Sequence, residues 1–82
     1  MPIYFIHVHQ GGRRAKDREG KCYPDLRAAE QEAIKAAREM AAQRVRAGKV
    51  LDLSNRLEIV DAQGKVAAVV TFKSAIPLRN AD

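Results

Sequence analysis

Apolar and polar residues alternate in the first ten positions of the chain. The segment PIYFIHVHQ is rich in aromatic and β-branched residues, which favour a strand. Alternation places Tyr4, Ile6 and Val8 on one face and Ile3, Phe5, His7 and His9 on the other. We predict that the first set faces the core, because its only polar atom is a phenol at the strand end.

Two turns containing glycine follow this strand. Gly11-Gly12 predicts a tight turn with positive φ, after which residues 13–16 return as a polar strand. The segment DREG at 17–20 predicts a second tight turn, with Gly20 in the left-handed conformation. A short third strand is expected over 21–23, where Pro24 closes it.

A helical pattern then runs from Leu26 to Ala47. Asp25 is a natural N-cap, alanine has the highest helix propensity, and Gly48 is typical of the residue just past a helix. At about 100° per residue, the predicted core face contains Leu26, Ala29, Ala33, Ala36, Ala37, Met40 and Ala47, widened by Ile34, Ala41 and Val45. The central alanines allow this helix to lie close to a sheet.

The last third of the chain predicts a hairpin, with strands over 56–61 and 65–72 and the turn DAQG between them. Both alternating faces of its second strand are apolar, which predicts a central strand or one covered on both sides. We expect residues 77–82 to be a disordered tail. The predicted fold is therefore a single α+β domain over 1–76, in the order β-β-β-α-β-β, with a small, mainly antiparallel sheet packed on one long helix.

Composition adds that the core is thin. The chain has 82 residues, too few for two domains, and aromatic residues make up only 5% of it. Much of the apolar content is alanine, which buries little area per residue. A thin core favours the burial of further surface between two copies of the chain. We therefore expect a homodimer as one of the possible partnerships.

The expected compartment is the cytoplasm. Cys22 is the sole cysteine, so no intramolecular disulfide forms. The sequence contains neither a secretory signal pattern nor an apolar run long enough for a membrane span, and no membrane association is expected.

Net charge is +5, and it is unevenly distributed. Residues 1–49 contain eleven Lys or Arg and six Asp or Glu, whereas residues 50–82 contain four of each kind. Such asymmetry can mark an anionic partner, but at a net charge of +5 solubility alone is the favoured explanation. The candidate anion or nucleic-acid contacts are Arg13, Arg14, Lys16, Arg18 and Lys21 around the turns, with Arg27, Lys35 and Arg38 on the helix.

Candidate catalytic or metal-binding groups are few. His7 and His9 point the same way on one strand, but two ligands do not make a metal site, and the simpler interpretation is two partly exposed histidines. Cys22 lies beside Lys21, which favours a thiolate, yet no base or orienting residue completes a nucleophilic set, so a buried or half-buried small residue is expected. The sequence contains no phosphate-loop motif and no dinucleotide-binding motif. We therefore expect no catalytic residues, no metal and no cofactor.

Several segments together resemble a known family. They are PIYFIHVHQGG, then YPDLRAAEQEA, then the alanine-rich helix ending at Gly48, then LEIVDAQGKV. This order is similar to a family of short bacterial proteins described only as a domain of unknown function, whose members begin Met-Pro-x-Tyr-x-x-His-Val and carry Pro-Asp-Leu before the helix. The resemblance implies one complete domain and brings no activity; His7 lies on its pattern and His9 does not. A fainter likeness, through Pro24, Asp25, Leu26 and Gly48, is to the N-terminal domain of HicB-type antitoxins.

Two functions remain as hypotheses from the sequence. The first is a small interaction or regulatory module without catalytic activity, whose partner is a protein or a second copy of the chain. The alternative is electrostatic nucleic-acid binding through the basic turns and the basic side of the helix. An enzyme ranks third, because so few candidate groups are present.

Overall fold

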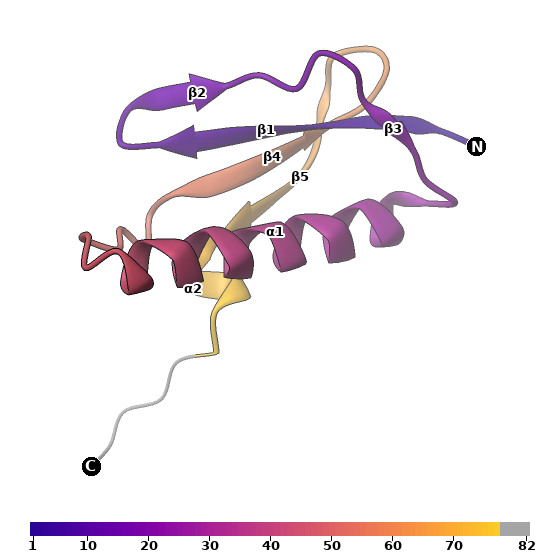
Figure 1. The fold of residues 1–82 in the computed structure, drawn as a ribbon. Coiled ribbons are helices and arrows are strands. Elements are labelled where there is room, and N and C mark those ends of the chain that lie inside the picture. The colour runs from indigo at the N-terminus through magenta and orange to yellow at the C-terminus, as the bar shows by residue number, and fades with distance from the viewer. Residues whose placement is uncertain (78–82) are drawn as a thin grey trace.

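The computed structural model describes residues 1–77, which form one sheet and two helices (Figure 1). The elements in chain order are β1 (Ile3–Gln10), β2 (Arg13–Ala15), β3 (Lys21–Cys22), α1 (Leu26–Arg46), β4 (Arg56–Val60), β5 (Val66–Thr71) and α2 (Phe72–Ala75). The α+β class and the predicted order are confirmed, with α2 as an additional short helix. The tail predicted over 77–82 falls almost entirely outside the described residues.

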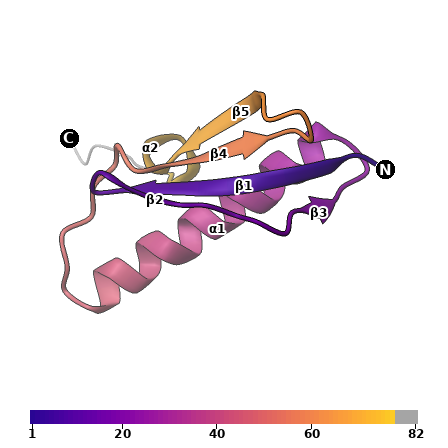
Figure 2. The same cartoon turned by 90° about the horizontal axis from the view of Figure 1, so that it is seen from above.

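The sheet is antiparallel throughout, in the order β2-β1-β4-β5, with β3 also paired to β1. Helix α1 lies across one face of this sheet, and no described element lies across the other (Figures 1 and 2). We call the uncovered side the open face. The architecture therefore has two layers, and only one face of the sheet borders the core.

Strand β5 is an edge strand, so the prediction of a central or doubly covered strand is wrong. Val66 and Val69 are 53% and 48% exposed. The register pairs Val60 with Val66 after an irregularity between Ile59 and Val60, which is the shift that a β-bulge produces. Both faces of the strand are apolar in sequence, but only one of them finds a helix to pack against.

The hydrophobic core lies between α1 and the sheet. The predicted core face of β1 is confirmed, since Tyr4, Ile6 and Val8 pack against this core. Its largest fully buried side chains are Leu57 and Ile59 of β4 and Phe72 of α2. The contribution of α1 is a row of buried alanines spaced four apart, Ala29, Ala33, Ala37 and Ala41. Small side chains along this row allow the helix to approach the sheet closely.

The ends of α1 form as predicted. The Asp25 side chain accepts a hydrogen bond from the N–H of Ala28 at 2.9 Å, and Gly48 has a φ of 68° just beyond the C-cap. Two residues assigned to the core face are nevertheless exposed, Val45 at 64% and Ala47. Val45 lies in the last turn of α1, and Ala47 is the C-cap residue that follows it.

Helix α2 replaces the last residue of the predicted final strand. The Thr71 hydroxyl accepts a hydrogen bond from the N–H of Ser74 and caps a single helical turn. Phe72 is thereby turned into the core, and Ala75 is buried beside it. The Arg38 guanidinium of α1 donates from Nε to the carbonyl of Ala75 at 2.7 Å and ties α2 to the long helix.

Candidate functional site

Polar side chains gather on the open face where β2, β1 and β4 run side by side. The register places Arg14, His9 and Arg56 opposite one another, in one row across the three strands. His7 and Glu58 face each other in the next row. The open face therefore brings both histidines together with two arginines and one carboxylate.

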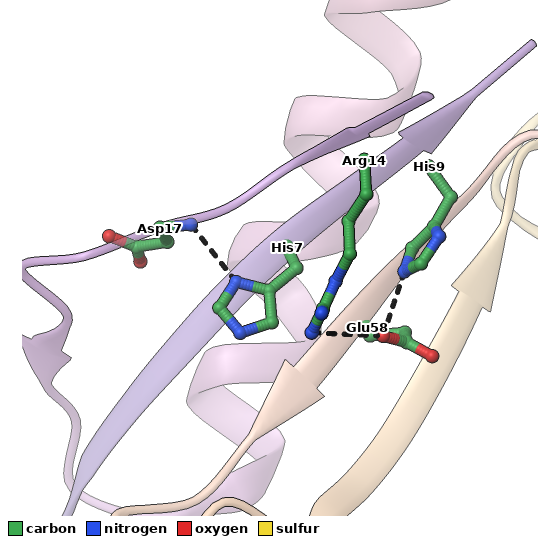
Figure 3. A network of polar contacts seen from close by, with 5 residues as sticks. All are labelled: His7, His9, Arg14, Asp17 and Glu58. Carbon is green, nitrogen blue, oxygen red and sulfur yellow. Dashed lines mark hydrogen bonds and ion pairs between the residues drawn. The ribbon is translucent and has the colours of Figure 1, made fainter. Parts of the chain in front are cut away.

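Glu58 is the centre of the ionic contacts (Figure 3). Its Oε1 lies 2.8 Å from Nε2 of His9 and 3.8 Å from a guanidinium nitrogen of Arg14. The hydrogen bond from His9 is the largest cause and lowers the pKa of Glu58. Burial raises this pKa by less, and the charges around it, those of Arg14 and Arg56 among them, lower it further. Because an ionised carboxylate only accepts hydrogen bonds, His9 is the donor at Nε2.

His7 is buried, with 4% of its surface exposed. Its Nδ1 accepts a hydrogen bond from the backbone N–H of Asp17 at 2.9 Å (Figure 3). A backbone N–H can only donate, so Nδ1 carries no proton and the neutral ring holds its proton on Nε2. Burial lowers the pKa of His7, and the charges of Arg14 and Lys16 lower it further, although Asp17 and Glu58 oppose them. The interpretation of His7 as a partly exposed strand histidine is therefore wrong.

The Asp17 carboxylate holds the segment between β2 and β3 against β1. Its Oδ1 accepts the N–H groups of Glu19 and Gly20, at 3.2 and 3.1 Å. Its Oδ2 accepts the N–H of Ile6 at 3.1 Å, at a point of β1 between the residues paired with β2 and those paired with β3. Burial by itself raises the pKa of Asp17, but the three N–H groups overcome that effect and lower it.

Gly20 is required at the end of this segment for two reasons. Its φ is 68°, a conformation that side chains with a Cβ rarely adopt. A Cβ at this position would also lie 2.7 Å from the ring of Phe5 and 2.9 Å from Cγ2 of Ile3. The turn predicted at residues 17–20 is confirmed, and the close approach to β1 explains why its last residue is glycine.

All eight predicted basic contact residues are exposed, but they lie in different parts of the surface. Arg13, Arg14, Lys16, Arg18 and Lys21 lie on β2, on β3 and on the segment between them; Arg27, Lys35 and Arg38 lie on α1. Lys21 is 3.9 Å from Glu32 of α1, while Arg38 donates to α2. The structure thus brings the first five residues together along one edge of the sheet and places the helical set on α1, and a contact role for either set stays a prediction.

The two histidines lie on the same face, as predicted. Nδ1 of His7 and Nε2 of His9 are each engaged in a hydrogen bond. Within residues 1–77 no group of three or more His, Cys, Asp or Glu side chains has an arrangement suited to a metal ion. Cys22 is exposed on β3, so the expectation that it is buried or half-buried is wrong. Tyr23 next to it is buried instead, because alternation turns that residue toward α1.

Sequence reasoning missed Asp17 and Glu58 as parts of this site. The sequence predicts only a turn role for Asp17, since an Asp three residues before a Gly is typical of turns. Its second function, to accept the N–H of Ile6, depends on a strand eleven residues earlier in the chain. Glu58 is the only charged residue between Leu57 and Val60, which is a signal of an exposed polar face, but its partners come from β1 and β2.

The fold and the site together define a class of protein, a two-layer α+β domain with one long helix on an antiparallel sheet and a polar cluster on the open face. Residues 3–73 match a family described as a domain of unknown function, DUF6894, and the chain belongs to this family. No curated protein and no solved structure shows significant similarity to the chain. The fainter likeness to HicB-type antitoxins is not confirmed. Among the residues that the structure describes, neither helix has the length and apolar character needed to cross a membrane.

Proposed function

We propose that this domain is a small interaction or regulatory module without catalytic activity, and that it acts through protein contacts. The observation that carries the proposal is the apolar end of the open face. Phe5, Val60 and Val66 are neighbours in one row across β1, β4 and β5, and Val69 lies on the same face opposite Glu58. Val60 is buried within this row, whereas Val66 and Val69 are half exposed because no element of residues 1–77 covers them. Exposed apolar side chains grouped in this way are typical of contact surfaces.

The free edge of β5 supports the same proposal. In an antiparallel ladder every second residue directs its backbone N–H and C=O away from its neighbour, so β5 presents unpaired groups on the side opposite β4. Lys65 and Lys73 flank the strand, and the irregularity near Val60 shortens the straight edge. Such features restrict indiscriminate pairing, and they favour a partner that adds a strand in one register.

The partner that we propose first is a second copy of the chain. Two β5 strands related by a two-fold axis run antiparallel. The segment VAAVVT has no charged residue, so two copies of it can pair without placing like charges opposite one another. The pairing joins two sheets into one and removes both free edges. It also compensates for the small apolar area that an alanine-rich core buries in one copy.

The test is sedimentation velocity of the wild-type chain and of Val69→Lys between about 1 and 100 μM, the range in which a weak dimer forms. We expect a dimer of wild-type chains and a monomer of 9.1 kDa for the variant. Val45→Lys is the matched control, because Val45 is also an exposed valine but lies on α1. A monomeric wild-type chain, or equal dissociation of both variants, contradicts pairing through β5.

Electrostatic nucleic-acid binding is the second candidate. It is favoured by the row of Arg14, His9 and Arg56 on the open face, next to the basic edge formed by β2. Fluorescence anisotropy against duplex and single-stranded oligonucleotides tests it, since log K should fall with log salt by about 0.9 for each phosphate contacted on a duplex. Joint replacement of Arg13, Arg14 and Lys16 by alanine should flatten that dependence. Binding that vanishes near physiological salt contradicts this candidate.

A further inference from the structure

A cleft opens at the end of the sheet where β1 turns into β2. It is lined by His9, Gly11, Gly12, Arg13, Asp52, Ser54, Asn55 and Arg56, and its volume is ≈ 300 Å³. The cleft lies at the opposite end of the strands from the apolar residues around Val66, because the β1–β2 turn and the β4–β5 turn are at opposite ends of the sheet. It is therefore separate from the proposed protein contact.

The turn between the two strands lines this cleft with Gly11 and Gly12. Gly11 and Gly12 have φ values of 53° and 80°, which is the two-residue hairpin turn in which both central residues are left-handed. The N–H of Gly11 donates to the side chain of Asn55 at 3.3 Å, and that contact fixes the turn against the chain before β4. The N–H of Gly12 has no acceptor among residues 1–77.

Two arginines flank the same turn. Arg13 and Arg56 are exposed, and neither forms an ion pair with a carboxylate within the described residues. Arg14, by contrast, is paired with Glu58 on the neighbouring row. Arg13 and Arg56 therefore bring positive charge to the cleft without a direct ion pair, and a guanidinium matches the oxygens of a tetrahedral oxyanion well.

Asp52 is the one acidic group that lines the cleft. Its Oδ1 accepts hydrogen bonds from the N–H and the hydroxyl of Ser54, at 2.9 and 2.6 Å. These bonds lower the pKa of Asp52, so the carboxylate is charged at neutral pH. Its negative charge opposes an anionic ligand and limits the affinity, although two arginines outweigh it.

We infer that this cleft binds a phosphate-type oxyanion, with Arg13 and Arg56 as the charged partners and the N–H of Gly12 as a backbone donor. The inference does not rest on the proposed protein contact, since it uses none of the same residues. Its ligand is a phosphate group, carried by a small phosphate compound or by a nucleic-acid backbone.

The first test is a titration of ¹⁵N-labelled protein with inorganic phosphate at low ionic strength, followed by amide chemical shifts. We expect saturable shifts centred on Gly12 and Arg13, and binding about tenfold or more weaker in Arg13→Gln and in Arg56→Gln, as for loss of a charge-assisted hydrogen bond. Arg27→Gln is the matched control, because Arg27 is an exposed arginine on α1. Shifts spread over all basic residues, or equal losses in all three variants, overturn the inference.

A second variant tests the sign of the electrostatic argument. Asp52→Asn keeps an oxygen that accepts from Ser54 but removes the negative charge, so phosphate should bind more tightly to it. Unchanged or weaker binding overturns the inference. Parallel titrations with phosphoserine and with a single-stranded oligonucleotide at matched phosphate concentration distinguish the two sources, because only a nucleic-acid site prefers the oligonucleotide. Loss of self-association in Val69→Lys with intact phosphate binding separates this site from the proposed protein contact.

Discussion

The contact between His7 and Asp17 makes a testable prediction about stability. His7→Phe keeps a flat ring of similar size in the buried position but removes the Nδ1 acceptor, so the N–H of Asp17 loses its partner. A buried donor without a partner costs about 1–3 kcal/mol, and we expect the lower part of this range because Asp17 is only half-buried. In a domain of this size each kcal/mol shifts the Tm by about 4–8 °C, so the variant should melt at a clearly lower temperature.

The same contact also predicts how stability depends on pH. The pKa of His7 is lower in the folded chain than in the unfolded one, so the unfolded state binds the proton more readily. The free energy of unfolding should therefore fall as pH drops below about 6.5, the pKa of an unperturbed histidine, and the loss ends at the folded pKa. One proton changes this free energy by at most about 1.4 kcal/mol per pH unit. Asp17 adds a second loss at lower pH, below its ordinary pKa of 3.8, because its folded pKa is also lowered.

The assay is a series of urea titrations between pH 7.5 and 4.5, which gives the free energy of unfolding at each pH. The chain has two histidines, and His9→Gln is the matched control that leaves only His7. We expect the fall below pH 6.5 to persist in His9→Gln and to be absent in His7→Phe. The same slope in His7→Phe as in the wild-type chain would refute the assignment of this pH dependence to His7.

Three further predictions concern the fold. Gly20→Ala should destabilise far more than Gly64→Ala in thermal melts, because both glycines have positive φ but only Gly20 lies against an aromatic ring; equal effects contradict the steric argument. Ala37→Leu should cost about 1–3 kcal/mol in a urea titration by overpacking the helix against the sheet, whereas Ala42→Leu, outside the buried row, should cost little; the reverse order means that the assigned face is wrong. Asp25→Ala should cost about 1 kcal/mol and reduce helical circular dichroism at elevated temperature through loss of the N-cap, and an unchanged Tm speaks against the cap.

Local features of the fold were predictable from the sequence because their causes lie within a few residues. The cap at Asp25, the helix stop at Gly48 and the left-handed turn ending at Gly20 each depend on neighbours close in the chain. Alternation in the first strand also identified Tyr4, Ile6 and Val8 as the core face. The sequence likewise placed His7 and His9 on the opposite face.

The candidate site was predictable only in part. Exposed basic residues around the turns were identified individually, and the structure places Arg13 and Arg14 on the same short strand, β2. Arg56 and Glu58 were not identified, because they join the histidines only when β4 pairs with β1, a contact across more than forty residues of chain. The sequence around a strand residue does not show which residues of the other strands will lie beside it in the sheet.

The sequence by itself thus determined the five strands, the long helix, their order and which face of β1 borders the core, since propensity, caps and alternation act over short distances, but it did not predict α2. Only the tertiary structure decided that β5 lies at an edge, that the open face stays uncovered and that His7 is buried. Both faces of β5 are apolar in sequence, so the sequence does not distinguish them. One face is buried because helices pack against it, and the other is exposed because no described helix covers it. The segment that carries Asp17 lies against β1 through the N–H of Ile6 and Nδ1 of His7, and it reaches this position only after β2 has paired with β1.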